Sequence, residues 1–353
     1  MNDYTKIVES VRLLADGQQP NENISKLLYD HNCFYLLSKV RGQDGYSQKL
    51  QVETRFNKIS TSERYKACQP ILEELEKLYI PYAIIKGAVL SKVAYGDIKI
   101  RKSGDIDLLL QRKDVDIVKK IMLKNGFVQG RVTDNGLAPF SRQELIFQSS
   151  LSHQMAPFIK KSNNMLHPYI HVDVNFDILW GESKQKADME FILSKTENMQ
   201  IYGVVIKKLT PAMEFIALCL HHYKHINSIY LLANGDLKLS MFCDIFFYIK
   251  NNNILCDELI EICSKLNVTE YIYYCIFYTN EIFKDECLAD YLSIMQNDKS
   301  KYILNTFGLN EQERKLWSVS FEERLFCDGF NEYFMSLLDS RDREKIHLNV
   351  SMF

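Results

Sequence analysis

The sequence predicts an α+β protein in which a small mixed β-sheet core is flanked by N-terminal and C-terminal helical regions. Apolar residues recur at helical spacing in residues 23–37 and 62–78, which is the pattern of amphipathic helices. After Pro81 the character changes, because short strand-like runs separated by Gly, Asn, Ser and Pro follow one another. From about residue 206 helical periodicity returns and continues to the end of the chain.

Individual elements of this core can be assigned in chain order. Residues 113–124 have the spacing of one amphipathic helix, and Asn125-Gly126 follows as a C-cap signal. Thr210 and Pro211 predict the N-cap and the first position of a later helix. The strand-like segments are PYAIIKG, DIDLLL, QELIFQ, HQMAPFI and YIHVDVNFDIL. The expected organisation is a helical region over 1–80, an α+β core over 81–205 and a helical domain over 206–353.

Composition excludes several classes of protein. The formal net charge of the 353 residues is −2, which argues against a general electrostatic attraction to nucleic acid or anionic lipid. The nine cysteines are scattered and form no C-x-x-C pair, which favours reduced thiols over a disulfide framework or a zinc ribbon. The first ten residues are polar and lack the apolar core of a signal peptide. No apolar run approaches the roughly 20 residues that span a bilayer. We therefore expect a cytoplasmic protein with no membrane partner.

Two aspartates lie two residues apart in the strand-like segment DIDLLL. In a strand, Asp105 and Asp107 point to one face, about 7 Å apart along the backbone, while Ile106 and Leu108 point to the core. Two like charges so placed repel each other unless a cation lies between them. Carboxylates in such a pair are suitable ligands for Mg²⁺. The alternative is a solvated edge strand whose polar face is acidic.

A second segment, YIHVDVNFDIL, alternates strictly between apolar and polar residues. The apolar positions predict one buried face of a strand, and the polar positions His171, Asp173, Asn175 and Asp177 predict a face lined with metal-capable side chains. If this strand pairs beside DIDLLL, three carboxylates form a cluster that can hold one or two Mg²⁺ ions and orient a triphosphate. A solvated sheet face is again the alternative.

Lys86 and Gly87 end a predicted strand and precede a helix-like stretch, residues 88–94. A helix N-terminus after a glycine exposes backbone N–H groups to an anion, and glycine allows a phosphate to approach the backbone closely. Lys86 adds a positive charge. Taken alone, this pattern also describes an ordinary strand-to-helix turn.

Taken together, the Lys-Gly turn, the short helix, the Tyr-Gly-Asp segment and RKSGDIDLLL resemble the bacterial family of uncharacterised nucleotidyltransferases. That family belongs to the DNA polymerase β-like superfamily, and the resemblance covers about residues 80–250, with Asp173 at the expected third carboxylate. Two positions depart from the pattern. Ala88 stands where the superfamily usually has serine, which removes a hydroxyl contact to phosphate, and Asn175 stands where many relatives have histidine.

The resemblance implies transfer of a nucleoside monophosphate from an NTP, with ATP the expected donor, to an acceptor, with release of pyrophosphate. Mg²⁺ is the implied cofactor, with Mn²⁺ as an alternative. Asp105 and Asp107 would bind the metal that holds the triphosphate, and Asp173 would complete a second metal site and assist the attacking hydroxyl. The residues implied in phosphate binding are Lys86, Gly87, Ala88, Arg101 and Gly104.

The acceptor class stays open at this stage. A small molecule, a peptide or a protein suits the near-neutral charge better than RNA does, although toxin-like relatives that modify tRNA keep that acceptor as an alternative. A nucleotide-binding or partner-binding module without turnover is the competing function, whereas a purely helical scaffold does not explain the acidic strand faces. Residues assigned to an acceptor cleft are His171, Asn175, His221, Lys238 and Asp244.

Overall fold

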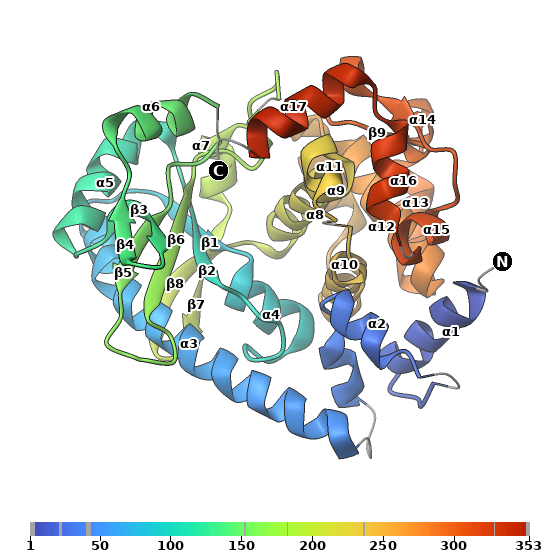
Figure 1. Cartoon of the computed structure of the whole chain (residues 1–353), viewed down its shortest axis with the longest axis horizontal. Coiled ribbons are helices and arrows are strands. Elements are labelled where there is room, and N and C mark those ends of the chain that lie inside the picture. Colours follow the sequence, from blue (N-terminus) through green and yellow to red (C-terminus); the bar gives the residue numbers. More distant parts are fainter. Residues whose placement is uncertain are drawn as a thin grey trace. The chain divides into compact units, whose positions relative to one another are not determined.

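The computed structural model describes residues 4–20, 23–39, 44–151, 153–181, 183–235, 237–327 and 329–350 (Figure 1). The chain forms two compact units. One, here called the helical unit, comprises Met1–Leu50, Cys219–Lys250 and Cys256–Phe353. The other, the sheet unit, comprises Gln51–Leu218 and Asn251–Leu255. Three of the four unit boundaries fall within helices α3 (Asp44–Lys77), α8 (Pro211–Asn227) and α10 (Leu239–Asn251), and the fourth directly precedes α11 (Cys256–Leu266). The domain limits near residues 80 and 205 stay predictions about the chain's organisation.

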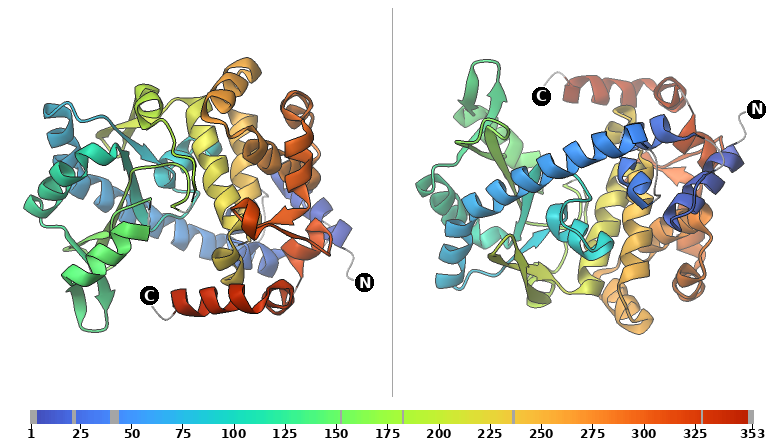
Figure 2. Two further views of the ribbon diagram at one scale, coloured as in Figure 1. Left: turned by 90° about the horizontal axis from the view of Figure 1, so that it is seen from above. Right: turned by 90° about the horizontal axis from the view of Figure 1, so that it is seen from below.

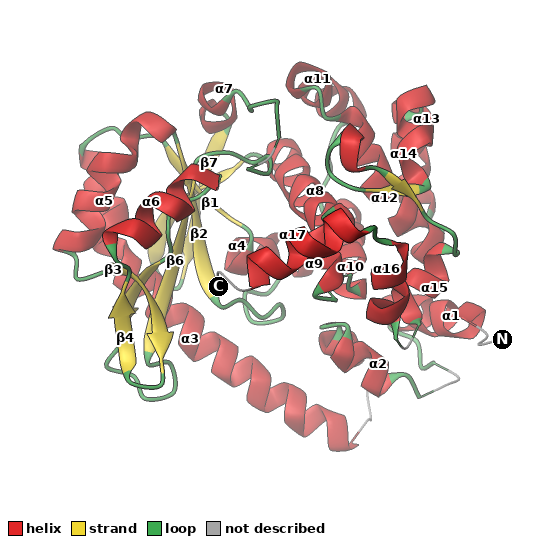
Figure 3. Cartoon of the chain, turned by 45° about the horizontal axis from the view of Figure 1, so that its top comes forward, coloured by secondary structure: helices red, strands yellow, loops and turns green. Residues whose placement is uncertain are grey.

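The sheet unit is built on a six-stranded mixed sheet with the order β1-β2-β6-β5-β3-β4. β2 and β6 pair in parallel, and the other neighbours pair antiparallel. Figure 3 shows these strands in yellow, with the long helix α3 and α5 among the helices of the same unit. The strands are β1 (Tyr82–Ile85), β2 (Asp105–Leu110), β3 (Val128–Thr133), β4 (Gly136–Pro139), β5 (Phe158–Lys161) and β6 (Tyr169–Asn175). The predicted α+β class with a small mixed sheet is confirmed.

Shorter elements complete the sheet unit. A separate antiparallel hairpin consists of β7 (Thr196–Ile201) and β8 (Val204–Leu209). The other helices are α4 (Gly87–Tyr95), the 3₁₀ turn η2 (Arg112–Asp114), α5 (Val115–Lys124), α6 (Arg142–Leu151) and α7 (Met189–Ser194). The predicted helix at 113–124 and its Asn-Gly stop are confirmed, because Gly126 has a φ of 81° and the amide of Phe127 donates to the carbonyl of Met122.

One hydrophobic core joins α3 and α5 to the apolar face of the sheet. The ribbon of the long helix α3 is drawn in blue in Figure 2. α3 contributes a row of buried side chains at helical spacing, as expected for an amphipathic helix. The strands contribute every second residue, so the period-two pattern of the sequence corresponds directly to burial. Members of this core include Cys68, Ile71, Leu75, Ile84, Ile106, Leu108, Val118, Met122, Val172 and Val174.

Two expectations for local structure were wrong. QELIFQ was expected to be a strand, but it lies in α6, because the Ser141 hydroxyl accepts from the amide of Glu144 and the Glu144 carboxylate accepts from the amide of Ser141. This reciprocal capping box starts a helix. The expected helix over 23–37 is interrupted, since Asn32 has a φ of 58° between α2 (Ser25–Asp30) and the 3₁₀ turn η1 (Phe34–Lys39). The strands of the hairpins β3–β4 and β7–β8 are not among those predicted from the sequence.

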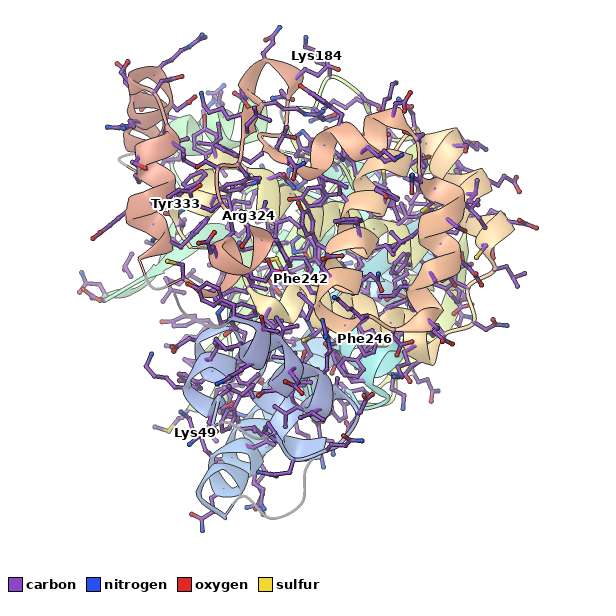
Figure 4. The ribbon with its side chains drawn as sticks, turned by 90° about the vertical axis from the view of Figure 1, so that its right-hand side faces the viewer. Lys49, Lys184, Phe242, Phe246, Arg324 and Tyr333 are labelled. Carbon is purple, nitrogen blue, oxygen red and sulfur yellow. The ribbon has the colours of Figure 1, made fainter. Side chains whose placement is uncertain are left out.

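The helical unit packs its helices around aromatic side chains. Phe246 of α10 stacks on Phe283 with ring centroids 4.1 Å apart, and Phe242 and Phe246 are both buried (Figure 4). Within the described ranges, no helix combines the length and the apolar character required to cross a bilayer. The remaining elements are α1 (Tyr4–Ala15), α9 (Ile229–Ala233), α11 (Cys256–Leu266), α12 (Thr269–Phe283), η3 (Glu286–Leu288), α13 (Ala289–Met295), α14 (Asp298–Leu304), β9 (Thr306–Phe307), η4 (Glu311–Glu313), β10 (Lys315–Leu316), α15 (Phe321–Phe326), α16 (Phe330–Leu337) and α17 (Ser340–Val350).

The stability of the helical unit is expected to fall between pH 6.5 and pH 4 because of His31. Burial, reinforced by Lys238, lowers the pKa of His31 to about 4, and its Nδ1 accepts from the amide of Leu239 at 3.1 Å. The unfolded chain, with a histidine pKa of about 6.5, therefore binds more protons in this window, and stability rises with pH through it. We expect His31→Gln to remove up to about 3 kcal/mol of this pH dependence. Urea unfolding at pH 4.5 and pH 7 gives the change in the free energy of unfolding between the two pH values. An equal change for the wild type and His31→Gln would contradict this prediction.

Candidate active site

The acidic residues of the two predicted strands lie next to each other in the sheet. In the parallel pair β2–β6, Asp105 is in register with His171 and Asp107 with Asp173. The intervening residue Ile106 is buried on the opposite face. All three aspartates are half-buried. The structure thus brings Asp105, Asp107 and Asp173 to one face of two adjacent strands, as the alternation of the sequence predicts.

The carboxylate of Asp107 accepts two hydrogen bonds at a single oxygen. Its Oδ1 lies 3.1 Å from the Lys86 ammonium and 3.2 Å from the amide nitrogen of Asn175. The Lys86 side chain is 20% exposed and that of Asp107 is 11% exposed, so water screens the ion pair only in part. The ammonium of Lys86 thus offsets the repulsion between the two aspartates of β2. Asn175 thus orients Asp107, and its place at an acceptor cleft stays a prediction.

The surroundings of Asp105 and His171 shift the pKa values of both side chains. Burial raises the pKa of Asp105, the charge of Asp107 raises it further, and the positive charges of Lys86 and Arg64 oppose the shift. Across the strand pair, burial lowers the pKa of His171, Asp105 opposes this shift, and Arg64 adds to it. The site therefore combines a carboxyl group with raised proton affinity and an imidazole that favours its neutral form.

The Lys-Gly turn holds its backbone in conformations that most residues avoid. Lys86 has φ 59° and ψ −151°, a region that is essentially restricted to glycine, and Gly87 follows with φ 48°. Gly87 begins α4, and Lys86 caps this helix with no side-chain hydrogen bond. A Cβ at Gly87 would lie 3.0 Å from the Ser103 hydroxyl, which itself donates to the carbonyl of Asp105. This backbone strain at an uncapped helix N-terminus is typical of a functional site.

The segment between α4 and β2 carries the remaining residues assigned to phosphate binding. The amide of Arg101 donates to the Ser91 hydroxyl at 3.0 Å, and the Asn57 side chain donates to the carbonyl of Arg101 at 3.0 Å. Gly104 is exposed, and a Cβ there would meet no atom within 4 Å. The roles of Ala88, Arg101 and Gly104 in binding phosphate stay predictions.

The residues assigned to an acceptor cleft divide between the two units. His171 and Asn175 belong to the sheet unit, whereas His221, Lys238 and Asp244 belong to the helical unit. Asp244 is 1% exposed, and its Oδ2 lies 3.3 Å from Nε2 of His222. A common acceptor cleft for these residues stays a prediction. Asp177 lies beyond β6, where its carboxylate accepts from the amide of Leu179 and stabilises a turn.

The oxygen donors of this face suit Mg²⁺ in their chemistry. No group of three or more His, Cys, Asp and Glu side chains in the described residues is gathered as a metal site. Mg²⁺ is commonly bound by one or two carboxylates together with substrate phosphates, so a complete protein cage is not required. The Lys86 ammonium on Asp107 shows that this face already binds a cationic group.

Two residues of the site region were missed by the sequence analysis. Arg64 and Asn57 lie on α3, in a segment assigned only to a helical region, and both are buried. Arg64 is 1% exposed and acts electrostatically on Asp105, and Asn57 binds the segment that precedes β2. The helical pattern contained a signal, because polar residues at positions 57, 61 and 64 continue the spacing of the apolar face at 68, 71 and 75.

Comparison with known proteins places this geometry in a family. No curated protein matches the chain. Among solved structures, an antigenic nucleotidyltransferase-like protein from Paracoccidioides brasiliensis is 18% identical, with a TM-score of 0.41, over 66% of this chain and 94% of that chain. A family model described as uncharacterised nucleotidyltransferase matches residues 22–284, which include α3, the Lys-Gly turn and all three aspartates. The chain therefore belongs to the family of uncharacterised nucleotidyltransferases.

Proposed function

We propose that this protein is a Mg²⁺-dependent enzyme that transfers a nucleoside monophosphate from an NTP, with ATP as the expected donor, to a small molecule, peptide or protein. Family membership supports a general nucleotidyltransferase role. The observation that carries the more specific proposal is the in-register pair of Asp107 and Asp173 on two parallel strands, beside the strained Lys-Gly turn. Acidic and cationic groups in this arrangement suit a substrate that brings both a divalent cation and phosphates.

In this proposal, Asp105, Asp107 and Asp173 hold the metal ions. Bound Mg²⁺ would neutralise charge on the triphosphate and on the departing pyrophosphate. Lys86 would then exchange its ion pair with Asp107 for contacts to phosphate, because the Asp107 carboxylate would bind the metal ion instead. Asn175 keeps the Asp107 carboxylate oriented through its amide while Lys86 moves.

The N-terminus of α4 binds the phosphates from the other side. The first backbone N–H groups of a helix have no acceptor within that helix, and the side chain of the N-cap residue Lys86 does not accept from those at Gly87 and the following residues, so they can donate to an anion. Ala88 provides its backbone N–H but no hydroxyl, so Lys86 and Arg101 supply the additional contacts. Fixed N–H dipoles and side-chain charges of this kind stabilise the charge that develops on the leaving group.

The chemical step is an in-line displacement at the α-phosphorus. A bond forms from an acceptor oxygen to the α-phosphorus, the bond from that phosphorus to the bridging oxygen breaks, and pyrophosphate leaves with the electron pair. Asp173 accepts the hydroxyl proton of the acceptor, because it lies in register with Asp107 on the neighbouring strand. Positioning and charge stabilisation supply most of the rate acceleration, as in phosphoryl transfer generally.

The proposal is tested by thermal unfolding of the purified protein with each NTP, with and without Mg²⁺. We expect one NTP to raise the unfolding temperature by several degrees only when Mg²⁺ is present, because a ligand at 100 times its dissociation constant stabilises by about 2.7 kcal/mol. The double variant Asp105→Ala/Asp107→Ala should lose this shift. Asp134→Ala, in the exposed turn between β3 and β4, is the control that should retain it.

Each outcome of this test has a defined meaning. A Mg²⁺-dependent shift followed by pyrophosphate release with candidate acceptors would support the enzyme, and release only with tRNA would reassign the acceptor. Nucleotide binding without pyrophosphate release for any acceptor would favour the binding module. No shift with any nucleotide would overturn the proposed function.

A further inference from the structure

We propose that a buried polar face of α3, formed by Asn57, Thr61 and Arg64, is a positioning element that holds in place the phosphate-binding segment leading into Asp105. This inference rests on the proposed function, since it assigns a role in nucleotide binding to residues that do not themselves contact the reacting atoms. Asn57 is 4% exposed, and Thr61 and Arg64 are each 1% exposed.

The polar face continues the core-facing side of the same helix. Positions 57, 61, 64, 68, 71 and 75 follow each other at intervals of three and four residues, so they lie along one face of α3. Cys68, Ile71 and Leu75 pack into the hydrophobic core as expected. The first half of this face instead buries an amide, a hydroxyl and a guanidinium. Burying such groups is unfavourable unless they form specific hydrogen bonds, which indicates that these residues have a task beyond packing.

Asn57 binds the segment that leads into β2. Its side-chain nitrogen donates to the carbonyl of Lys99 at 2.8 Å and to the carbonyl of Arg101 at 3.0 Å. From α4, the Ser91 hydroxyl accepts from the amide of Arg101 and donates to the carbonyl of Asp97 at 2.7 Å. The backbone of Arg101 is thus held at its N–H by one helix and at its carbonyl by another. Such bracing fixes the path of a segment that carries a residue assigned to phosphate binding.

A hydrogen-bond chain connects Asn57 to Arg64 along the same face of α3. The Arg64 guanidinium donates to the Thr61 hydroxyl at 3.0 Å, and that hydroxyl lies 3.4 Å from the side-chain oxygen of Asn57. Nε of Arg64 is buried without a hydrogen-bond partner in the part of the chain that the structure describes. The carboxylate that acts most strongly on Arg64 is Asp105, the first residue of β2. Arg64 therefore adds a buried positive charge that acts on Asp105, while Asn57 fixes the backbone of the segment that precedes β2.

The test measures the affinity of the full-length protein for ATP with Mg²⁺ and for inorganic pyrophosphate with Mg²⁺, by calorimetry. Asn57→Asp keeps the shape of the side chain but replaces both amide donations with repulsion from the two carbonyls. We expect it to lower the affinities for both ligands by the same factor, about tenfold or more. Equal factors identify an effect on phosphate binding. Asn125→Asp is the matched control, because Asn125 donates to the carbonyl of Ile121 at the end of α5, and it should leave both affinities unchanged.

Thr61→Val is the second variant, because it removes the hydroxyl that links Arg64 to Asn57 while changing side-chain volume little. We expect it to lower the affinities for ATP and for pyrophosphate by a few-fold each. If Asn57→Asp does not fold, Thr61→Val alone provides the test. Variants that bind both ligands as tightly as the Asn125→Asp control would overturn this inference and leave the proposed function intact. Wild-type protein that binds neither ligand would overturn the proposed function and, with it, this inference.

Discussion

Replacing Asp107 with asparagine is expected to lower the rate of pyrophosphate release about a thousandfold, with little change in the unfolding temperature. Asp107 lies at the centre of the site, in register with Asp173 and bound by both Lys86 and Asn175. Asparagine keeps an oxygen that accepts these hydrogen bonds, so the local structure should persist, but the charge that binds a cation is lost. Loss of one preorganised charge-stabilising group from an active site lowers turnover by about a hundred- to a thousandfold.

The measurement is pyrophosphate release with the donor NTP and an acceptor identified beforehand, together with thermal unfolding. Asp134→Asn removes a charge of the same kind from an exposed turn and should retain full activity. Turnover by Asp107→Asn within tenfold of the wild type would exclude Asp107 as a metal ligand. A large loss of unfolding temperature would instead assign Asp107 to the stability of the sheet unit.

The second large effect is expected from two substitutions of Lys86, which together distinguish the effect of its charge from the effect of its strained backbone. Lys86→Ala removes the ammonium but keeps a Cβ at φ 59° and ψ −151°, whereas Lys86→Gly removes both the charge and the strain. Both should weaken Mg²⁺-ATP binding about a hundredfold, because a group that contacts the triphosphate directly is lost. Lys86→Gly should nevertheless be more stable than Lys86→Ala by about 1–3 kcal/mol, since glycine adopts this conformation without strain.

The comparison requires equilibrium unfolding in urea and calorimetric binding for each variant. Lys284→Gly is the matched control, because Lys284 also has a positive φ, 48°, at the end of α12 in the helical unit. That variant should gain stability without losing nucleotide affinity. If Lys86→Gly and Lys86→Ala proved equally stable, the turn would store no strain. If either bound nucleotide like the wild type, Lys86 would have no role in phosphate binding.

The sequence predicted the strands of the site because the alternation of apolar and polar residues involves only near neighbours in the chain. In DIDLLL and YIHVDVNFDIL, strict alternation separates the core face from the polar face, and burial of Ile106, Leu108, Val172 and Val174 follows that alternation. The Asn-Gly stop after residue 124 and the Thr-Pro start before α8 are also local signals, and the structure ends and begins its helices there. The capping box of Ser141 and Glu144 is also local, and in the structure it prevails over the strand propensity of QELIFQ.

Other features depend on contacts between residues far apart in the chain. Asn175 and Lys86 bind the same oxygen of Asp107 across separations of 68 and 21 residues, and no spacing rule predicts that convergence. Asn57 reaches the carbonyl of Arg101 over 44 residues, from a helix whose first half carries a row of polar residues. The spacing places this polar row on the core-facing side of the helix, but only the tertiary structure shows that the segment before β2 is its partner.

For this protein, local patterning was therefore sufficient for the α+β class and for the polar face of each strand that carries an aspartate, whereas the pairing of β2 with β6 brings the three aspartates together. Strand periodicity and glycine conformation are properties of a few neighbouring residues, so they can be read without the fold. Tertiary structure alone decided that the Lys86 ammonium lies on Asp107, that Arg64 lies buried near Asp105 and that α3 braces the segment before β2. Those relations depend on burial and on the pairing of distant segments, which arise only when the chain closes its core.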